Sequence, residues 1–168
     1  MEDLGVLNKE IVGVKERQLK DVAGSYTYFA DNDVLLAKIT PCFENGKIGI
    51  ARNLVNGVGF GSSEYLVFRS KGKIEPDYLY YFLSRNQIRE EGKKYMSGAV
   101  GHKRVSKEWI ENQIIQFPEP LKEQQTIVQK LDTLSAKTKK MEAIYQQHIS
   151  DLEELKKSIL QKAFNGEL

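Results

Sequence analysis

The chain has 168 residues, a length that suits one ordinary domain with an appendage, and 40% of them are hydrophobic. With 29% charged residues, a net charge of +2 and no apolar run as long as a membrane span, a membrane protein is excluded, and no secretory leader is recognisable. The single cysteine, Cys42, excludes an internal disulfide and favours the reducing cytoplasm.

The first 70 residues are expected to form a turn-rich, mostly antiparallel β-sheet. Residues 1–20 lack the apolar alternation of an opening strand, so we expect the domain to lack its first strand. Strand-forming residues and tight-turn pairs then alternate. We expect strands at 26–29, 34–40, 47–52 and 64–70, with turns at 31–33, 45–46 and 56–57.

Helices are expected after Pro76, which suits a first helical position, and again over 86–95. Ser106 is a candidate cap for a short helix that carries Trp109. Residues 113–117 are predicted to form a returning strand. The fold class is therefore α+β, with a domain over 1–118 and one long helix in residues 119–168.

The long helix is expected from Leu121 to about Phe164, a span without proline or glycine and roughly 65 Å in length. Its apolar residues recur in alternating steps of four and three, which is the seam of a coiled coil. The predicted interface residues are Ile127, Leu131, Leu134, Met141, Tyr145, Leu152, Leu155 and Ile159. Thr138, His148 and Lys162 are polar members of the seam. A helix folded back on its own domain is the alternative, but the stripe is longer than so small a domain could cover.

A basic loop follows the second helix. Residues 92–107 contain five lysine and arginine side chains and no acid, whereas residues 119–168 carry eight basic and eight acidic side chains. His102, Lys103 and Arg104 on a glycine-containing loop suit phosphate contact or base reading. A solvated charged loop is the competing interpretation.

Two further clusters of polar donors lie earlier in the chain. Lys38, Thr40, Asn45 and Lys47 flank a predicted tight turn, in which Cys42 and Phe43 are expected in the core. Ser62 and Ser63 end a glycine-rich stretch, but strand-like residues follow it, so a dinucleotide fingerprint is not supported. The sequence has no Walker A pattern and no metal-ligand spacing, and no catalytic site assembles from these residues.

Several segments, in order, resemble the target recognition domain of the specificity subunit of type I restriction-modification systems. These segments are residues 33–47, 59–65, 76–81, 120–128 and 160–168. The resemblance begins near residue 26, and its order and spacing are more specific than any one motif. The chain departs from the family pattern by having one domain and one helix, and by lacking the opening strand with its tryptophan and Leu-Gly pair.

The resemblance implies a non-catalytic subunit that reads one half of a split double-stranded DNA target. Methyltransferase subunits, which use S-adenosylmethionine, and a motor-nuclease subunit, which uses ATP and magnesium, would be its partners, and the chain itself would bind no cofactor. A half-subunit of this kind is expected to form a homodimer through its long helix, or else to be a C-terminal fragment.

Two other classes of function remain open on the sequence. A coiled-coil scaffold with a protein-binding β domain predicts no salt-dependent affinity for DNA. An enzyme that uses Cys42 as a nucleophile predicts fast thiol alkylation, but both histidines lie where a cysteine–histidine pair is not expected.

Overall fold

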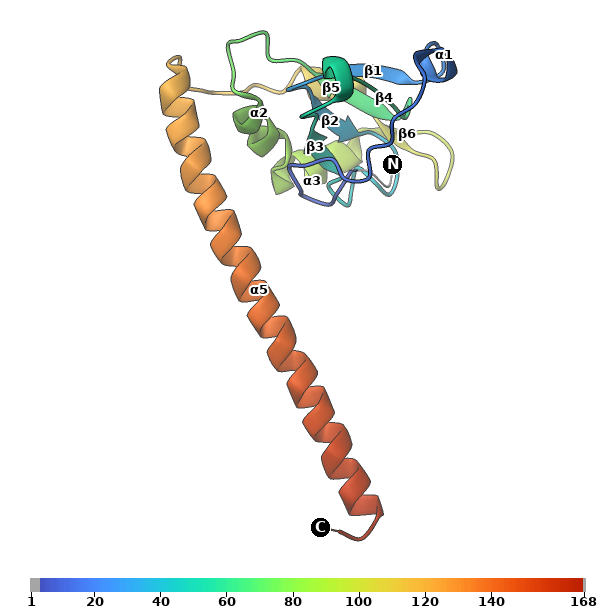
Figure 1. The fold of residues 1–168 in the computed structure, drawn as a ribbon, viewed down its shortest axis with the longest axis vertical. Helices are drawn as coiled ribbons and strands as arrows, with labels where there is room; N and C mark the ends of the chain where they lie inside the picture. Colours follow the sequence, from blue (N-terminus) through green and yellow to red (C-terminus); the bar gives the residue numbers. More distant parts are fainter. Residues whose placement is uncertain (1–3, 168) are drawn as a thin grey trace. The chain divides into compact units, whose positions relative to one another are not determined.

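The computed structural model describes residues 4–167 (Figure 1). It contains two compact units, which divide between Val128 and Gln129. The first unit holds all the strands and the short helices, and the second is one helix.

The named strands among residues 4–167 pair antiparallel, in agreement with the mostly antiparallel sheet expected for the first 70 residues. The central sheet has the order β3-β2-β5, and two smaller sheets pair β1 with β4 and β6 with β7 (Figure 1). The strands are β1 (Thr27–Ala30), β2 (Val34–Ala37), β3 (Ile48–Ile50), β4 (Val58–Gly61), β5 (Tyr65–Phe68), β6 (Met96–Ser97) and β7 (Arg104–Val105).

Two helices of the first unit, α2 and α4, begin at the predicted start signals. Pro76 opens α2, and the Ser106 hydroxyl accepts a hydrogen bond from the Trp109 backbone N–H at the start of α4. The helices are α1 (Leu19–Val22), a 3-10 turn η1 (Val55–Gly57), α2 (Pro76–Leu83), α3 (Asn86–Lys94) and α4 (Lys107–Glu111).

The central strand β2 is buried on both faces, which explains its continuous apolar sequence. Val34 and Leu36 point into a core shared with the helices α2, α3 and α4. Leu35 and Ala37 point into a second core on the other face, because side chains alternate along a strand.

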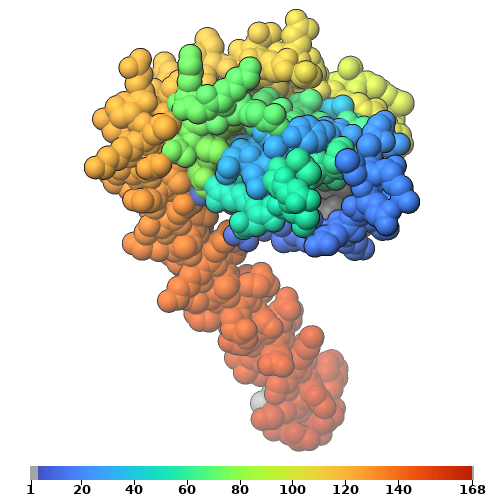
Figure 2. All heavy atoms as spheres, turned by 45° about the horizontal axis from the view of Figure 1, so that its top comes forward, coloured from blue at the N-terminus to red at the C-terminus, as the bar shows by residue number. Residues whose placement is uncertain are grey.

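The N-terminal segment contributes to that second core. Leu4 is fully buried there and bridges to Ile11. This burial differs from the weak patterning that the first twenty residues suggest, because only single apolar residues point inward along an irregular segment. Figure 2 shows part of this segment, in blue, on the same face as the teal chain around the Asn56–Gly57 turn.

The glycine-rich stretch, expected to connect strands, is itself the strand β4, because it pairs antiparallel with β1. Its glycines make room for aromatic rings. A Cβ atom on Gly61 would lie 2.6 Å from the ring of Tyr65, and one on Gly59 would overlap the ring of Phe29. The two rings therefore pack directly over the backbone of β4.

The predicted strand at 113–117 is wrong. These residues form an irregular connection, in which Ile114 is 86% exposed and Gln116 accepts a hydrogen bond from the Tyr78 hydroxyl through its backbone carbonyl. Pro118 and Pro120 follow at once and have no N–H to donate to a ladder.

The long helix α5 spans Leu121–Phe164, as predicted. Its first two turns belong to the first unit, where Gln124 and Val128 are buried. In the part of α5 that belongs to the second unit, Leu131 is half-buried and the larger apolar side chains from Leu134 to Phe164 are exposed. No helix among residues 4–167 is long and apolar enough to cross a membrane.

Candidate nucleic-acid interface

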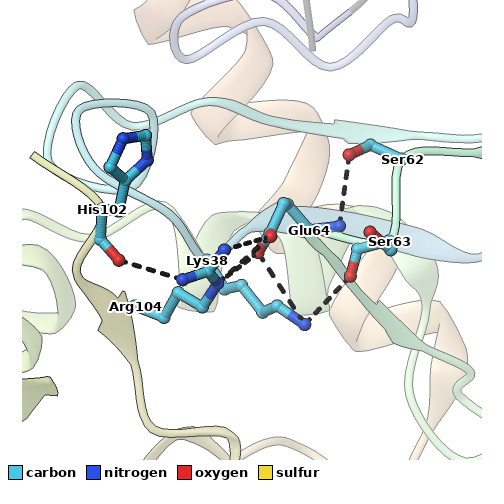
Figure 3. A network of polar contacts seen from close by, with 6 residues as sticks. All are labelled: Lys38, Ser62, Ser63, Glu64, His102 and Arg104. Atoms are coloured by element: carbon cyan, nitrogen blue, oxygen red, sulfur yellow. Dashed lines mark hydrogen bonds and ion pairs between the residues drawn. The ribbon is translucent and has the colours of Figure 1, made fainter. Parts of the chain in front are cut away.

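Three separate segments of the first unit meet beyond the end of the central sheet. They are residues 38–40, 62–64 and 103–105 (Figure 3). The Lys38 backbone N–H donates to the Glu64 carbonyl at 2.9 Å, which extends the pairing of β2 with β5.

The basic loop joins the same arrangement through its backbone. Val105 N–H donates to the Lys38 carbonyl, and Thr40 N–H donates to the Lys103 carbonyl, both at 2.9 Å. These two bonds form an antiparallel bridge. The loop is therefore anchored at its C-terminal end by main-chain bonds rather than by side chains alone.

Arg104 and Glu64 form a forked ion pair at this junction. The Arg104 Nε donates to Glu64 Oε2 at 2.9 Å and Nη2 donates to Oε1 at 2.6 Å. The Nη1 atom donates to the His102 carbonyl at 3.0 Å. Figure 3 shows the carbonyl of His102 directed toward Arg104 and its imidazole directed away from the ion pair.

Lys38 approaches the same carboxylate from the other side. Its Nζ donates to the Ser63 carbonyl at 2.9 Å and lies 4.0 Å from Glu64 Oε2. The Ser62 hydroxyl accepts from the Glu64 backbone N–H at 3.2 Å, a local bond typical of a serine turn. Two cations and one anion thus share a surface that keeps one net positive charge.

The ion pair fixes the charge state of Glu64. The Arg104 guanidinium lowers the pKa of the Glu64 carboxyl below its ordinary value, and Glu64 raises the pKa of Arg104. Both groups are therefore ionised at neutral pH. The Glu64 side chain is 21% exposed and that of Arg104 is 45% exposed, so the pair faces solvent and can meet a ligand.

Most of the sequence-predicted site residues converge here. The surface gathers Lys38, Thr40, Ser62, Ser63, His102, Lys103 and Arg104 from three segments far apart in the chain. Asn45 and Lys47 lie in the adjoining turn of residues 41–47, where their backbone N–H groups donate to Pro41 and Cys42.

Glu64 was missed as a member of the site by reasoning from the sequence. Its place directly before an apolar strand marks it only as a polar boundary residue. Its role follows from the pairing of β2 with β5, which no local pattern specifies.

The surroundings of Cys42 are those of a structural residue rather than of a nucleophile. Phe43 is fully buried in the main core, and Cys42 packs partly buried against the second core, as the structural interpretation predicts. Within residues 4–167, no group of three or more histidine, cysteine, aspartate or glutamate side chains is placed to hold a metal ion.

An exposed basic loop on an α+β domain is typical of a nucleic-acid-binding module. The family model for the type I restriction modification DNA specificity domain matches residues 11–150, and the chain belongs to this family. That family is defined by DNA specificity rather than by a reaction, so the chain is a specificity domain and is not an enzyme.

The curated relatives are specificity subunits. That of the type I restriction enzyme EcoAI from Escherichia coli is 42% identical over 113 residues, which are 67% of this chain and 19% of that protein. That of EcoEI, from the same species, is 39% identical over 120 residues, which are 69% of this chain and 20% of that protein. The chain therefore spans about a fifth of the length of these relatives.

The fold is shared with a solved HsdS subunit. The HsdS subunit from Thermoanaerobacter tengcongensis aligns with a TM-score of 0.69 and 21% identity over 92% of this chain and 39% of that one. This likeness supports the α+β fold class with its long C-terminal helix.

Proposed function

We propose that this chain reads one half of a bipartite double-stranded DNA target and directs methylation and restriction by partner subunits in the cytoplasm. The supporting observation is the basic loop of residues 102–104, which is exposed at its tip and anchored by main-chain bonds to residues 38–40. Residues 1–118 serve as the recognition domain and residues 119–168 as the spacer.

The proposed DNA contacts include side chains suited to phosphates and side chains suited to bases. Exposed Lys103, with Lys47 of the adjoining turn, is suited to phosphates, and the hydroxyl and amide groups are suited to base edges or sugars. The full set is Lys38, Thr40, Asn45, Lys47, Ser62, Ser63, His102, Lys103 and Arg104.

The partner chemistry is divided between subunits in this proposal. Methyltransferase subunits hold S-adenosylmethionine, and a motor-nuclease subunit holds ATP and magnesium, while this chain binds neither cofactor nor metal. A second copy of the chain pairs with the first through the α5 seam, which gives a two-fold complex and an interrupted palindrome as its target.

The test is binding of double-stranded DNA across a series of salt concentrations. Phosphate contacts release counterions, so affinity should fall steeply as salt rises, and Lys103→Ala should weaken binding and reduce the slope of log affinity against log salt by about 1. Lys156→Ala, which removes an exposed lysine from the long helix, is the matched control and should leave the slope unchanged.

Affinity without salt dependence, or a Lys103→Ala slope equal to that of the wild type, would contradict the assignment of the loop. Absence of any DNA affinity would favour the coiled-coil scaffold instead.

A further inference from the structure

The hydrogen bonds of Arg104 leave part of its guanidinium group available. A guanidinium has five N–H donors. Glu64 takes the one on Nε and one on Nη2, and the His102 carbonyl takes one on Nη1. One N–H on each terminal nitrogen therefore has no partner among residues 4–167.

The group is also held in a fixed orientation. The Glu64 carboxylate is positioned by its own main chain, whose carbonyl is bonded to Lys38 and whose N–H is bonded to Ser62. The His102 carbonyl holds the other side of the guanidinium. An arginine that is already oriented loses less side-chain entropy when it binds.

The negative charge of Glu64 favours a neutral acceptor over a phosphate for the remaining N–H groups of Arg104. Guanine presents O6 and N7 in the major groove as a pair of acceptors on a neutral base, and arginine binds them with two donors. A phosphate also accepts two N–H bonds, but it would bring its negative charge close to the Glu64 carboxylate, which the lowered pKa keeps ionised. Lys103, the residue directly before Arg104, is exposed and has no such acidic partner among the described residues.

We propose that Arg104 reads a guanine of the target in the major groove, and that Glu64 is the positioning residue that orients Arg104 and disfavours phosphate. This inference rests on the proposed function, because it names a base that the same surface selects. Lys38, bonded to the Ser63 carbonyl, supports Glu64 from the opposite side.

The experiment is selection of bound sites from a pool of double-stranded DNA with a randomised segment, followed by sequencing. The wild-type chain should enrich sites with a constant guanine at one position. Arg104→Lys should relax that position by roughly 10- to 100-fold, because lysine cannot make the bidentate contact, while the remaining positions stay selected.

Glu64→Gln provides the second arm. It should relax the same position as Arg104→Lys, and its affinity for random DNA should be equal to or higher than that of the wild type, because a negative charge is removed. A variant that merely fails to fold would lose affinity for every sequence, and its melting temperature would fall with it. Lys103→Ala is the matched control, expected to weaken binding to all sites without changing the selected bases.

The outcomes distinguish a failure of the proposed DNA recognition from a failure of the guanine contact by Arg104. A wild-type chain that enriches no sequence overturns the proposed function, and the guanine assignment with it. A wild-type chain that enriches a site whose bases are unchanged in Arg104→Lys, with a uniform loss of affinity, makes Arg104 a phosphate contact and overturns this inference alone. Relaxation by Arg104→Lys without relaxation by Glu64→Gln removes the positioning role of Glu64.

Discussion

Asp33 closes the turn between β1 and β2 with a carboxylate that is fully buried. Its Oδ2 accepts from the Ala30 backbone N–H at 2.7 Å and from Arg69 Nη2 at 2.6 Å, and its Oδ1 accepts from Arg69 Nε at 2.7 Å. A buried carboxylate is tolerated when it is paired and hydrogen-bonded in this way. At the residue scale, Asp33 is therefore a structural ion-pair member, whereas the exposed pair of Arg104 with Glu64 is available to a ligand.

Asp33→Asn is expected to destabilise the first unit by about 1.5–3 kcal/mol, because a neutral amide replaces charge-assisted bonds and leaves part of them unmade. The free energy of unfolding in urea measures this change. Asp31→Asn is the matched control: Asp31 is exposed and accepts from the Leu54 N–H, a bond that an amide oxygen can keep, so about 0.5 kcal/mol or less is expected. Equal effects of the two substitutions would contradict the buried role of Asp33.

Single residues differ in how far the sequence predicts them. Lys103 and Arg104 can be predicted because they belong to a local run of basic residues without an acid. Glu64 does not, because its partners lie 26 and 40 residues away and meet it only through the pairing of β2 with β5 and the Ile39–Arg104 bridge. Leu4 is similarly hidden, since one buried residue in an irregular segment produces no period.

Elements with a strong local signal are predicted well, and those defined by long-range pairing are not. Pro76, the Ser106 cap and the proline-free heptads place α2, α4 and α5 within their observed bounds. Residues 113–117 contain the strand-forming side chains Ile114, Ile115 and Phe117, but they pair with no strand among the described residues and form an irregular connection. The local sequence indicates which residues can form a strand. Whether they do depends on a partner strand to which their backbone can hydrogen-bond.

The start of α5 is fixed to the domain by one fully buried side chain, Gln124. Its amide oxygen accepts from the Glu75 N–H at 2.8 Å, and its Nε2 donates to the carbonyls of Lys73 and Pro118 at 3.1 and 2.7 Å. One amide thus satisfies three backbone groups from two connections that have no ladder of their own. The predicted coiled-coil pattern gives no hint of this role, because Gln124 lies before the first seam residue.

Gln124→Ala is therefore expected to cost about 2–4 kcal/mol, because it removes a fully buried amide and leaves one backbone donor and two backbone acceptors without their partner. Urea unfolding of the chain, followed by circular dichroism, measures the loss. Gln125→Ala removes an exposed amide that bonds to Glu75 Oε1, and it should change stability by less than about 0.5 kcal/mol. A small effect of Gln124→Ala would mean that water replaces the amide and that the junction is not a clamp.

On the scale of the whole molecule, the two units differ in whether their apolar side chains are buried. The first unit buries apolar side chains in two cores, one on either face of β2. The second presents a seam along one helix, in which Leu152 is 65% exposed and Met141, Tyr145, Leu155 and Ile159 are also exposed. Ile127 and Leu131, at the start of the seam, are half-buried. A stripe of this length on a single helix favours pairing with another helix.

Light scattering over a concentration series tests whether that other helix is a second copy. We expect a particle of twice the 19.2 kDa chain mass, which dissociates in Leu152→Asp because a charge in the seam would be buried without a partner. Ser150→Asp introduces the same charge off the seam and should leave the dimer intact. A stable dimer pairs the two recognition domains by a two-fold axis and requires an interrupted palindrome as the target. A monomer at every concentration would contradict the homodimer, and the seam would then await a helix from a different segment, with no symmetry imposed on the DNA.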